Sequence, residues 1–199
     1  MKSIEILTIV NEFKETGNYS LIEKLENNLK EDIRKELVKK TGNVKIDAVL
    51  KRMHQSLNSK KLYHPELQGY SKVGKRFLFT DSYRMIVLNS DYGYKPMELK
   101  TDFSKFTILG SDYKEVTVDI EELAYHVKLC KALTKENPHK KTGYYEIPNT
   151  NTCINGYWLL EMLKALKTDT IQILSPIAPV YIGNTSNEFG MILPMRKTV

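Results

Sequence analysis

The chain has 199 residues, of which 41% are hydrophobic, and its formal net charge is +6. This length and apolar content suffice for one main domain with a full core and exclude a second large domain. No stretch approaches the roughly 18 uninterrupted apolar residues of a membrane helix, and Glu5 makes the N-terminus acidic too early for a signal peptide. We therefore expect a cytoplasmic protein without membrane contact.

The charge is unevenly distributed along the chain. Residues 1–43 contain eight basic and eight acidic residues, whereas residues 44–199 contain 22 basic and 16 acidic residues, a difference equal to the whole net charge. A basic body with a neutral extension is compatible with binding to a polyanion, although many basic proteins never bind nucleic acid.

Residues 1–43 have the pattern of a helical extension. Apolar spacing over residues 4–13 predicts an amphipathic helix that ends at Gly17. Ser20 is the expected N-cap of a second helix, whose charged remainder fits either a solvated face or a partner-binding and self-associating surface. The predicted main domain covers residues 44–199.

The main domain begins with the pattern of a strand, a helix and a hairpin. We expect a short strand at residues 44–46 and a helix capped by Asp47. Residues 65–73 and 76–88 are strand candidates, and Gly74 can supply the positive φ of a tight turn between them.

A further strand and helix lie in the middle of the chain. Residues 116–118 predict the strand and Asp119 the N-cap of the helix, which should bury Ile120, Leu123, Val127, Cys130 and Leu133. Residues 143–147 then form a β-like run. This segment either elaborates the link between two half-domains, the interpretation we favour, or is itself the first helix of the second half.

The last fifty residues show the order strand, helix and strands again. Residues 152–155 predict a strand and residues 156–167 a helix, and three short β-like runs follow. The repeat predicts an α+β fold made of two half-domains, with helices on one face of antiparallel sheets. Residues 180–182 and 191–193 should be antiparallel neighbours, because a cluster of turn-forming residues connects them.

Two motifs resemble those of the bacterial DNA sliding clamp family, the beta subunit of the replicative polymerase. The C-terminal unit with Leu193-Pro194-Met195-Arg196 resembles the closing half-domain of that family. Thr80-Asp81-Ser82-Tyr83-Arg84-Met85 resembles its Thr-Asp-Gly-x-Arg pattern, with Ser82 in place of glycine. The resemblance implies a clamp-like fold and a role in DNA replication, as a processivity factor or docking platform. From the residues alone, the second motif is also a well-capped hairpin.

In that family, helices line the hole of a ring, and their basic residues contact phosphates without reading bases. The resemblance thus implies double-stranded DNA as a partner and a contact surface made of Lys51, Arg52, Lys128, Lys131, Lys135, Lys164 and Lys167. Each of these residues also fits an ordinary solvated helix face. Because the family ring contains six such domains, one domain could encircle DNA only as part of a homo-oligomer.

The family also binds short peptides of DNA polymerases and other replication proteins in an apolar pocket. The resemblance places this pocket at Thr80, Ser82, Tyr83, Arg84, Met85, Leu193, Pro194 and Met195. Adaptable Met and Leu side chains suit varied peptides, although Leu193 and Met195 could instead alternate into the core. The family draws the two sets from neighbouring domains, so a complete pocket could require an adjoining subunit.

No catalytic constellation emerges from the sequence. The histidines show no metal-ligand spacing with each other or with cysteines, and there is no phosphate-binding glycine loop or nucleophile elbow. We expect neither enzymatic activity nor a cofactor or metal, and we expect Cys130 and Cys153 to be buried thiols. The alternatives are a clamp-fold interaction protein, for example of a phage or mobile element, that binds replisome components without encircling DNA, and a nucleic-acid-processing enzyme.

Overall fold

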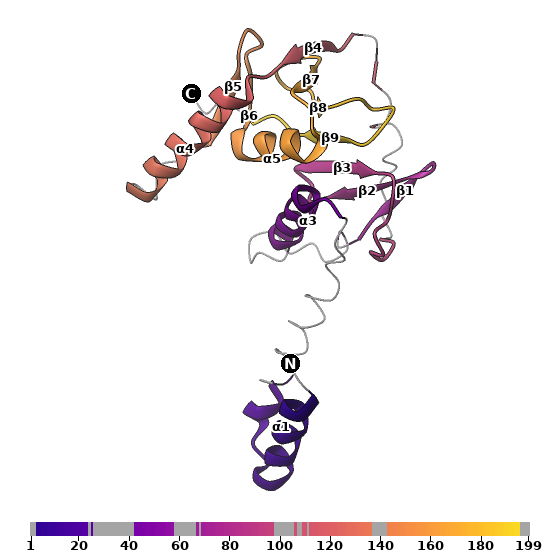
Figure 1. The fold of residues 1–199 in the computed structure, drawn as a ribbon, viewed down its shortest axis with the longest axis vertical. Helices are drawn as coiled ribbons and strands as arrows, with labels where there is room; N and C mark the ends of the chain where they lie inside the picture. The colour runs from indigo at the N-terminus through magenta and orange to yellow at the C-terminus, as the bar shows by residue number, and fades with distance from the viewer. Residues whose placement is uncertain are drawn as a thin grey trace. The chain divides into compact units, whose positions relative to one another are not determined.

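A computed structural model describes residues 3–23, 25, 42–57, 67, 69–97, 106, 109–110, 112–136 and 143–195. The chain divides into two compact units, Met1–Lys39 and Lys40–Val199 (Figure 1). None of the helices in these ranges has the length and apolar character needed to cross a membrane.

The first unit begins with helix α1 (Ser3–Thr16). The helix ends at Gly17, whose φ of 64° is left-handed and whose N–H donates a hydrogen bond to the Phe13 carbonyl. Asn18 then caps the next helical turn, because its Oδ1 accepts the N–H of Ser20 at 3.0 Å. The prediction that Ser20 is the N-cap is therefore wrong, and the later part of the predicted second helix lies outside the described residues.

The second unit contains the main sheet and the helices that pack on it. In chain order its described elements are α3 (Val44–Leu57), β1 (Ser71–Val73), β2 (Arg76–Thr80), β3 (Arg84–Leu88), β4 (Lys114–Thr117), α4 (Ile120–Glu136), β5 (Tyr144–Ile147), β6 (Thr152–Asn155), α5 (Gly156–Leu166), β7 (Thr170–Ile173), β8 (Val180–Ile182) and β9 (Phe189–Ile192). This composition confirms the predicted α+β class.

The strands form a seven-stranded sheet in the order β1-β2-β3-β9-β8-β7-β4 and a separate β5-β6 pair, with antiparallel neighbours throughout. A helix followed by three consecutive strands therefore occurs twice, as α3-β1-β2-β3 and α5-β7-β8-β9. These two helix-and-strand repeats, both within the second unit, meet where β3 pairs with β9. The predicted neighbours β8 and β9 are confirmed, with Val180 opposite Ile192.

Residues 44–46 form the first turn of α3, so the strand predicted there is wrong. Asn43 is the N-cap, because its Oδ1 accepts the N–H groups of Lys45 at 3.0 Å and Ile46 at 3.3 Å. The helix thus begins ahead of Asp47, the predicted cap. The β-branched character of Val44 and Ile46 suggested a strand, but the asparagine cap and the burial of Ile46 decide for a helix.

The two predicted hairpin strands differ from the observed ones. Of residues 65–73, strand β1 takes Ser71–Val73, and residues 65, 66 and 68 lie outside the described residues. The run 76–88 is divided into β2 and β3 by a turn at residues 81–83.

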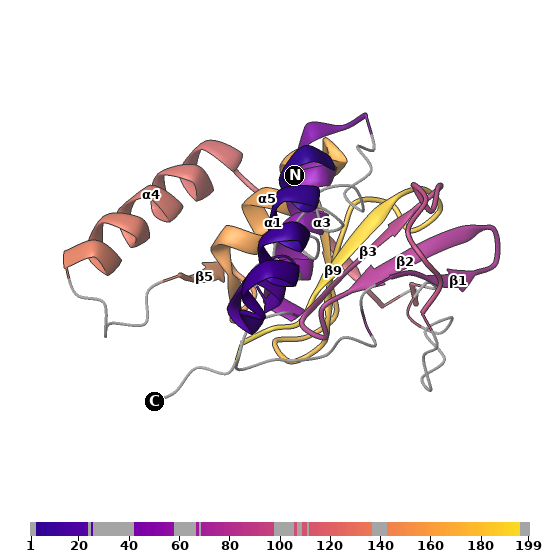
Figure 2. The ribbon, with the colours of Figure 1, turned by 90° about the horizontal axis from the view of Figure 1, so that it is seen from below.

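Helices α3 and α5 cover one face of the sheet, and α4 packs against α5 (Figure 2). The covered face contributes Phe79, Ile86, Leu88, Ile171 and Ile182 to the main core. Side chains from the same strands that point to the opposite face form a second buried cluster of Leu78, Met85, Val87, Tyr181, Phe189 and Met191. The sheet is therefore apolar on both faces.

The middle helix α4 has the predicted cap and most of the predicted buried face. Asp119 Oδ1 accepts the N–H groups of Glu121 and Glu122 at 2.9 and 3.0 Å. Its buried side chains are Leu123, Val127 and Cys130, and Ile120 is half-buried. Leu133 is 43% exposed, so the prediction that it is buried is wrong. It lies in the last turn of α4, which ends at Glu136.

The middle segment does not belong to either repeated unit. Strand β4 adds to the edge of the sheet beside β7, and β5 pairs with β6 immediately before α5. This arrangement supports the interpretation that the segment elaborates the link between the half-domains. Cys130 and Cys153 are buried thiols that form no disulfide, as predicted.

Candidate functional site

The two segments predicted to line a peptide pocket lie side by side in one chain. Strand pairing places Arg84 of β3 opposite Ile192 of β9. Beyond the last pair, the N–H of Leu193 donates to the Tyr83 carbonyl at 2.9 Å. The Met195 N–H donates to the Cys153 carbonyl at 2.7 Å, which attaches the C-terminal segment to β6. The two segments therefore meet within one chain.

The turn between β2 and β3 is held by its own side chains. Asp81 Oδ1 accepts the N–H groups of Tyr83 at 3.2 Å and Arg84 at 3.0 Å. The Thr80 hydroxyl donates to the Arg84 carbonyl at 3.0 Å and accepts the Ser82 N–H at 3.1 Å. These bonds fix the backbone on which Tyr83 is presented to solvent.

Ser82 adopts a φ of 74°, in the left-handed region where a Cβ is unfavourable. We expect Ser82→Gly to raise the free energy of unfolding by about 0.5–1 kcal/mol, because relief of this strain exceeds the entropy that glycine adds to the unfolded chain. Urea denaturation measures the change. Ser82→Ala is the control and should give no increase, since alanine keeps the Cβ. Equal stabilisation by both variants would contradict this explanation.

Arg84 is the centre of a buried ionic cluster. Its side chain is 2% exposed, its Nε lies 2.8 Å from Asp81 Oδ2, and its Nη1 lies 3.3 Å from Glu161 Oε2 on α5. The guanidinium carbon lies 4.9 Å from the centroid of the Trp158 ring. Glu161 also forms an ion pair with Arg52 of α3. The cluster therefore connects the turn to two helices.

This geometry changes the part that Arg84 can play. The Arg84 guanidinium is engaged by two carboxylates and an aromatic ring, so it is not free to bind a ligand. Instead it positions the turn, including the adjacent Tyr83, at the end of the sheet. Sequence reasoning missed both Trp158 and Glu161. Their spacing of three places them on one face of the predicted helix, which is a signal for a shared partner.

The remaining predicted pocket residues differ in accessibility. Thr80 and Met85 are buried, and Met85 belongs to the core on the sheet face opposite the helices. Ser82 and Tyr83 are exposed. The three C-terminal residues, Leu193, Pro194 and Met195, are half-buried. Direct contact with a peptide is thus available to the exposed and half-buried members.

An aromatic pair extends this accessible surface. The rings of Tyr83, which is 41% exposed, and half-buried Trp158 have centroids 6.1 Å apart. We call the surface made of Tyr83, Trp158, Leu193, Pro194 and Met195 the sheet-end cluster. The loop after β7 reaches the same end of the sheet, because Val180 pairs with Ile192, and it exposes Leu174 and Ile177. This end of the sheet is rich in accessible apolar side chains.

The predicted DNA-binding residues occur on α3, α4 and α5, the three helices in the described part of the main unit. Lys51 and Arg52 lie on α3, Lys128, Lys131 and Lys135 on α4, and Lys164 and the C-cap Lys167 at the end of α5. All seven are exposed. Two have intramolecular partners: Arg52 pairs with Glu161, and the Lys131 Nζ lies 5.6 Å from the Tyr157 ring centroid. Phosphate contact by these residues stays a prediction.

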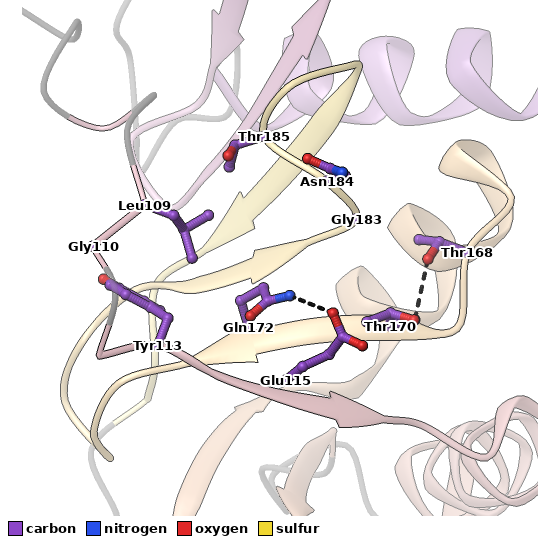
Figure 3. A pocket seen from close by; sticks show the side chains of 10 residues that line it. All are labelled: Leu109, Gly110, Tyr113, Glu115, Thr168, Thr170, Gln172, Gly183, Asn184 and Thr185. Carbon is purple, nitrogen blue, oxygen red and sulfur yellow. Dashed lines mark hydrogen bonds between the residues drawn. The ribbon is translucent and has the colours of Figure 1, made fainter.

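A polar cavity of about 410 Å³ opens at the other end of the sheet, near the start of β7 (Figure 3). Its lining consists of Leu109, Gly110, Tyr113, Glu115, Thr168, Thr170, Gln172, Gly183, Asn184 and Thr185. Gln172 Nε2 donates to Glu115 Oε2 at 2.8 Å, so these two groups satisfy each other. The ring of Tyr113, which lines the cavity, lies 5.3 Å from that of Tyr181, and burial and this neighbouring tyrosine raise the pKa of Tyr181 to about 12. None of the predicted site residues lines this cavity.

No cluster of three or more His, Cys, Asp or Glu side chains suited to a metal ion occurs in the described ranges. The half-buried His54 of α3 stacks edge-on against Tyr94, with ring centroids 5.1 Å apart, and burial lowers its pKa. Its position is that of a packed core-boundary histidine.

The structure is similar to those of bacterial DNA sliding clamps. A Helicobacter pylori beta clamp bound to a DNA ligase peptide is 16% identical over 74% of this chain and 62% of that chain, with a TM-score of 0.47. The beta subunit from DNA polymerase of Streptococcus pyogenes is 14% identical over 74% and 64%, with a TM-score of 0.46. A Bartonella birtlesii clamp bound to griselimycin is 13% identical over 70% and 60%, with a TM-score of 0.48.

The chain spans less than two thirds of the length of each of these clamps. No family model matches the chain, and no curated protein matches its sequence.

Proposed function

We propose that this protein acts in DNA replication as a clamp-fold docking platform whose sheet-end cluster binds short apolar peptide segments of DNA polymerase or other replication proteins. The observation that supports this proposal is the junction of the two motifs. The hydrogen bond from Leu193 to Tyr83 places the Thr80–Met85 turn and the C-terminal segment at one end of one sheet.

The chemistry of the sheet-end cluster suits a short apolar ligand. Met195 is unbranched and adapts its shape to different partners, while Tyr83 and Trp158 offer ring faces and polar edges. The turn that carries Tyr83 is held in one conformation, because Asp81 accepts the Arg84 N–H and also pairs with the Arg84 guanidinium. A preformed surface loses little conformational entropy when a peptide binds.

The helix layer supports the second part of the proposal, that the protein binds duplex DNA as a processivity factor. Exposed lysines on flexible stems attract phosphates without selecting a base sequence. To encircle DNA, several copies of the chain would have to form a ring. The alternative remains an interaction protein that uses the sheet-end cluster on replisome components and does not encircle DNA.

Peptide binding tests the first part of the proposal. A peptide with a clamp-binding consensus should bind the wild-type protein at micromolar Kd, about −8 kcal/mol. Replacing both Tyr83 and Met195 by alanine should raise Kd at least about tenfold, because both are accessible anchors. Fluorescence anisotropy measures Kd, and thermal unfolding should show that the fold is kept.

The matched control is Tyr125→Ala, which removes another exposed tyrosine, on α4. It should leave the Kd for the consensus peptide unchanged. Met85 is unsuitable for this test, because it is buried and its truncation would destabilise the core. Failure of the wild-type protein to bind, or equal binding by the double variant, would overturn the docking proposal.

A further inference from the structure

Ser82 holds a strained backbone conformation in the turn between β2 and β3. Its φ of 74° lies in the left-handed region, which is unfavourable for a residue with a Cβ. The turn cannot relax easily, because Thr80 and Asp81 side chains accept the N–H groups of residues 82–84. Glycine adopts this φ without strain. The turn itself therefore gives no reason for a serine side chain at this position.

Four other non-glycine residues in the described part of the chain have a positive φ, and each has a local reason. Asn149 and Asn151 are asparagines, which tolerate this region better than most residues. Lys167 is the C-cap of α5, and the half-buried Tyr92 packs against the main core. Ser82 is exposed, and its hydroxyl bonds to none of the described residues. Strain at a candidate site without a structural reason points to a role for the side chain.

The backbone N–H groups around the sheet-end cluster are already occupied. In the turn, side chains accept the N–H groups of residues 82–84. In the C-terminal segment, Leu193 and Met195 donate their N–H groups to carbonyls of this chain, and Pro194 has none. These backbone groups are therefore not available as donors to a ligand.

A peptide that docks on an apolar surface needs donors, because its backbone carbonyls lose water there and an unpaired buried carbonyl opposes binding. Three side chains at this surface can donate: the Ser82 and Tyr83 hydroxyls and the Trp158 indole N–H. Of the three donors, the Ser82 Oγ lies closest to the backbone. Its place is therefore set most directly by the hydrogen-bonded turn.

We propose that the Ser82 hydroxyl donates a hydrogen bond to a backbone carbonyl of the docked peptide. The inference rests on the function proposed for the sheet-end cluster and names the ligand group that the cluster recognises. Helical carbonyls are bonded within their own helix, so the ligand is an apolar segment in extended conformation. A bond to the main chain does not depend on the ligand's side chains, so the cluster accepts different sequences.

The first test measures the Kd of a peptide with a clamp-binding consensus by fluorescence anisotropy. Ser82→Ala keeps the Cβ and removes the hydroxyl, so it should raise Kd about three- to tenfold, as expected for one neutral hydrogen bond. Ser82→Gly should raise Kd by a similar factor although it stabilises the fold. A purely structural role of Ser82 predicts no loss of affinity from a more stable turn. Thermal unfolding shows that each variant is folded.

The matched control is Ser186→Ala, which removes another exposed serine hydroxyl, in the turn between β8 and β9. That turn lies at the other end of these strands from the Val180–Ile192 pair. The variant should leave the Kd for the consensus peptide unchanged.

A second measurement identifies the carbonyl that is bound. In a series of consensus peptides, one amide at a time is replaced by an ester, whose carbonyl is a weaker acceptor. At one position, the ester should weaken binding to the wild-type protein more than binding to Ser82→Ala, because the variant has no hydroxyl to form the bond. At the other positions, both proteins should respond equally, as independent changes do.

The outcomes separate this inference from the docking proposal. Failure of the wild-type protein to bind the consensus peptide would overturn both. Binding with the same Kd by the wild type and Ser82→Ala would overturn this inference alone. Equal responses of the two proteins to the ester at every position would do the same, since the hydroxyl would then not contact the peptide main chain.

Discussion

Replacing Arg84 by alanine should lower the free energy of unfolding by about 3–5 kcal/mol, because it leaves the buried Asp81 carboxylate without its charge partner. Glu161 loses one of its two arginines in the same variant. The effect is large because Asp81 and Arg84 are 2% and 3% exposed, so water cannot replace the lost contact. Chemical denaturation followed by circular dichroism measures the change.

Arg52→Ala is the matched control, since it removes the other arginine that pairs with Glu161. The Arg52 side chain is 56% exposed, so this variant should lower the free energy of unfolding by less than about 1 kcal/mol. Combining Arg84→Met with Asp81→Asn should recover part of the stability, because both buried charges are removed together. Equal losses for Arg84→Ala and Arg52→Ala would show that the buried cluster does not hold the turn.

Replacing Lys51, Lys128 and Lys164 by alanine, one lysine on each helix, should sharply weaken binding to duplex DNA. If all three contact phosphates, the slope of log Kd against log salt should fall by roughly three, because each contact releases about one counterion. At about 0.1 M salt, this corresponds to a loss of affinity of roughly 10²–10³-fold. Titration of labelled duplexes of two different base sequences should give the same result.

The control for charge alone replaces three exposed lysines outside the helices, namely Lys72, Lys75 and Lys95. It changes the net charge equally but should alter the slope little. If both triple variants bind DNA like the wild type, the result favours the alternative proposal, an interaction protein that does not encircle DNA. Solution mass with and without DNA then shows whether several copies assemble on the duplex.

The docking and DNA-binding proposals use different parts of the main unit. The sheet-end cluster lies at the start of β3, the end of β9 and the first turn of α5, whereas the lysines lie farther along α3, α4 and α5. Variants of one surface therefore serve as folding controls for the other.

Local sequence patterns determined most of the secondary structure, because caps and periodicity act within a few residues. Asp119 begins α4 as expected, and the strand and helix predicted at residues 152–167 match β6 and α5. Where the prediction failed, a competing local signal was stronger. Asn43, not Asp47, is the N-cap of α3. In the same way, Asn18, not Ser20, caps the helical turn that follows α1.

Tertiary structure alone decided how the residues of the candidate site come together. Arg84 and Glu161 are 77 residues apart in the chain, and nothing in the local pattern of either segment specifies the other. The turn and the C-terminal segment meet only because β3 selects β9 as its neighbour in this register. The exposure of Leu129 and Leu133 likewise depends on where α4 packs against α5. Periodicity identifies an apolar face, but only the arrangement of neighbours determines whether that face is covered.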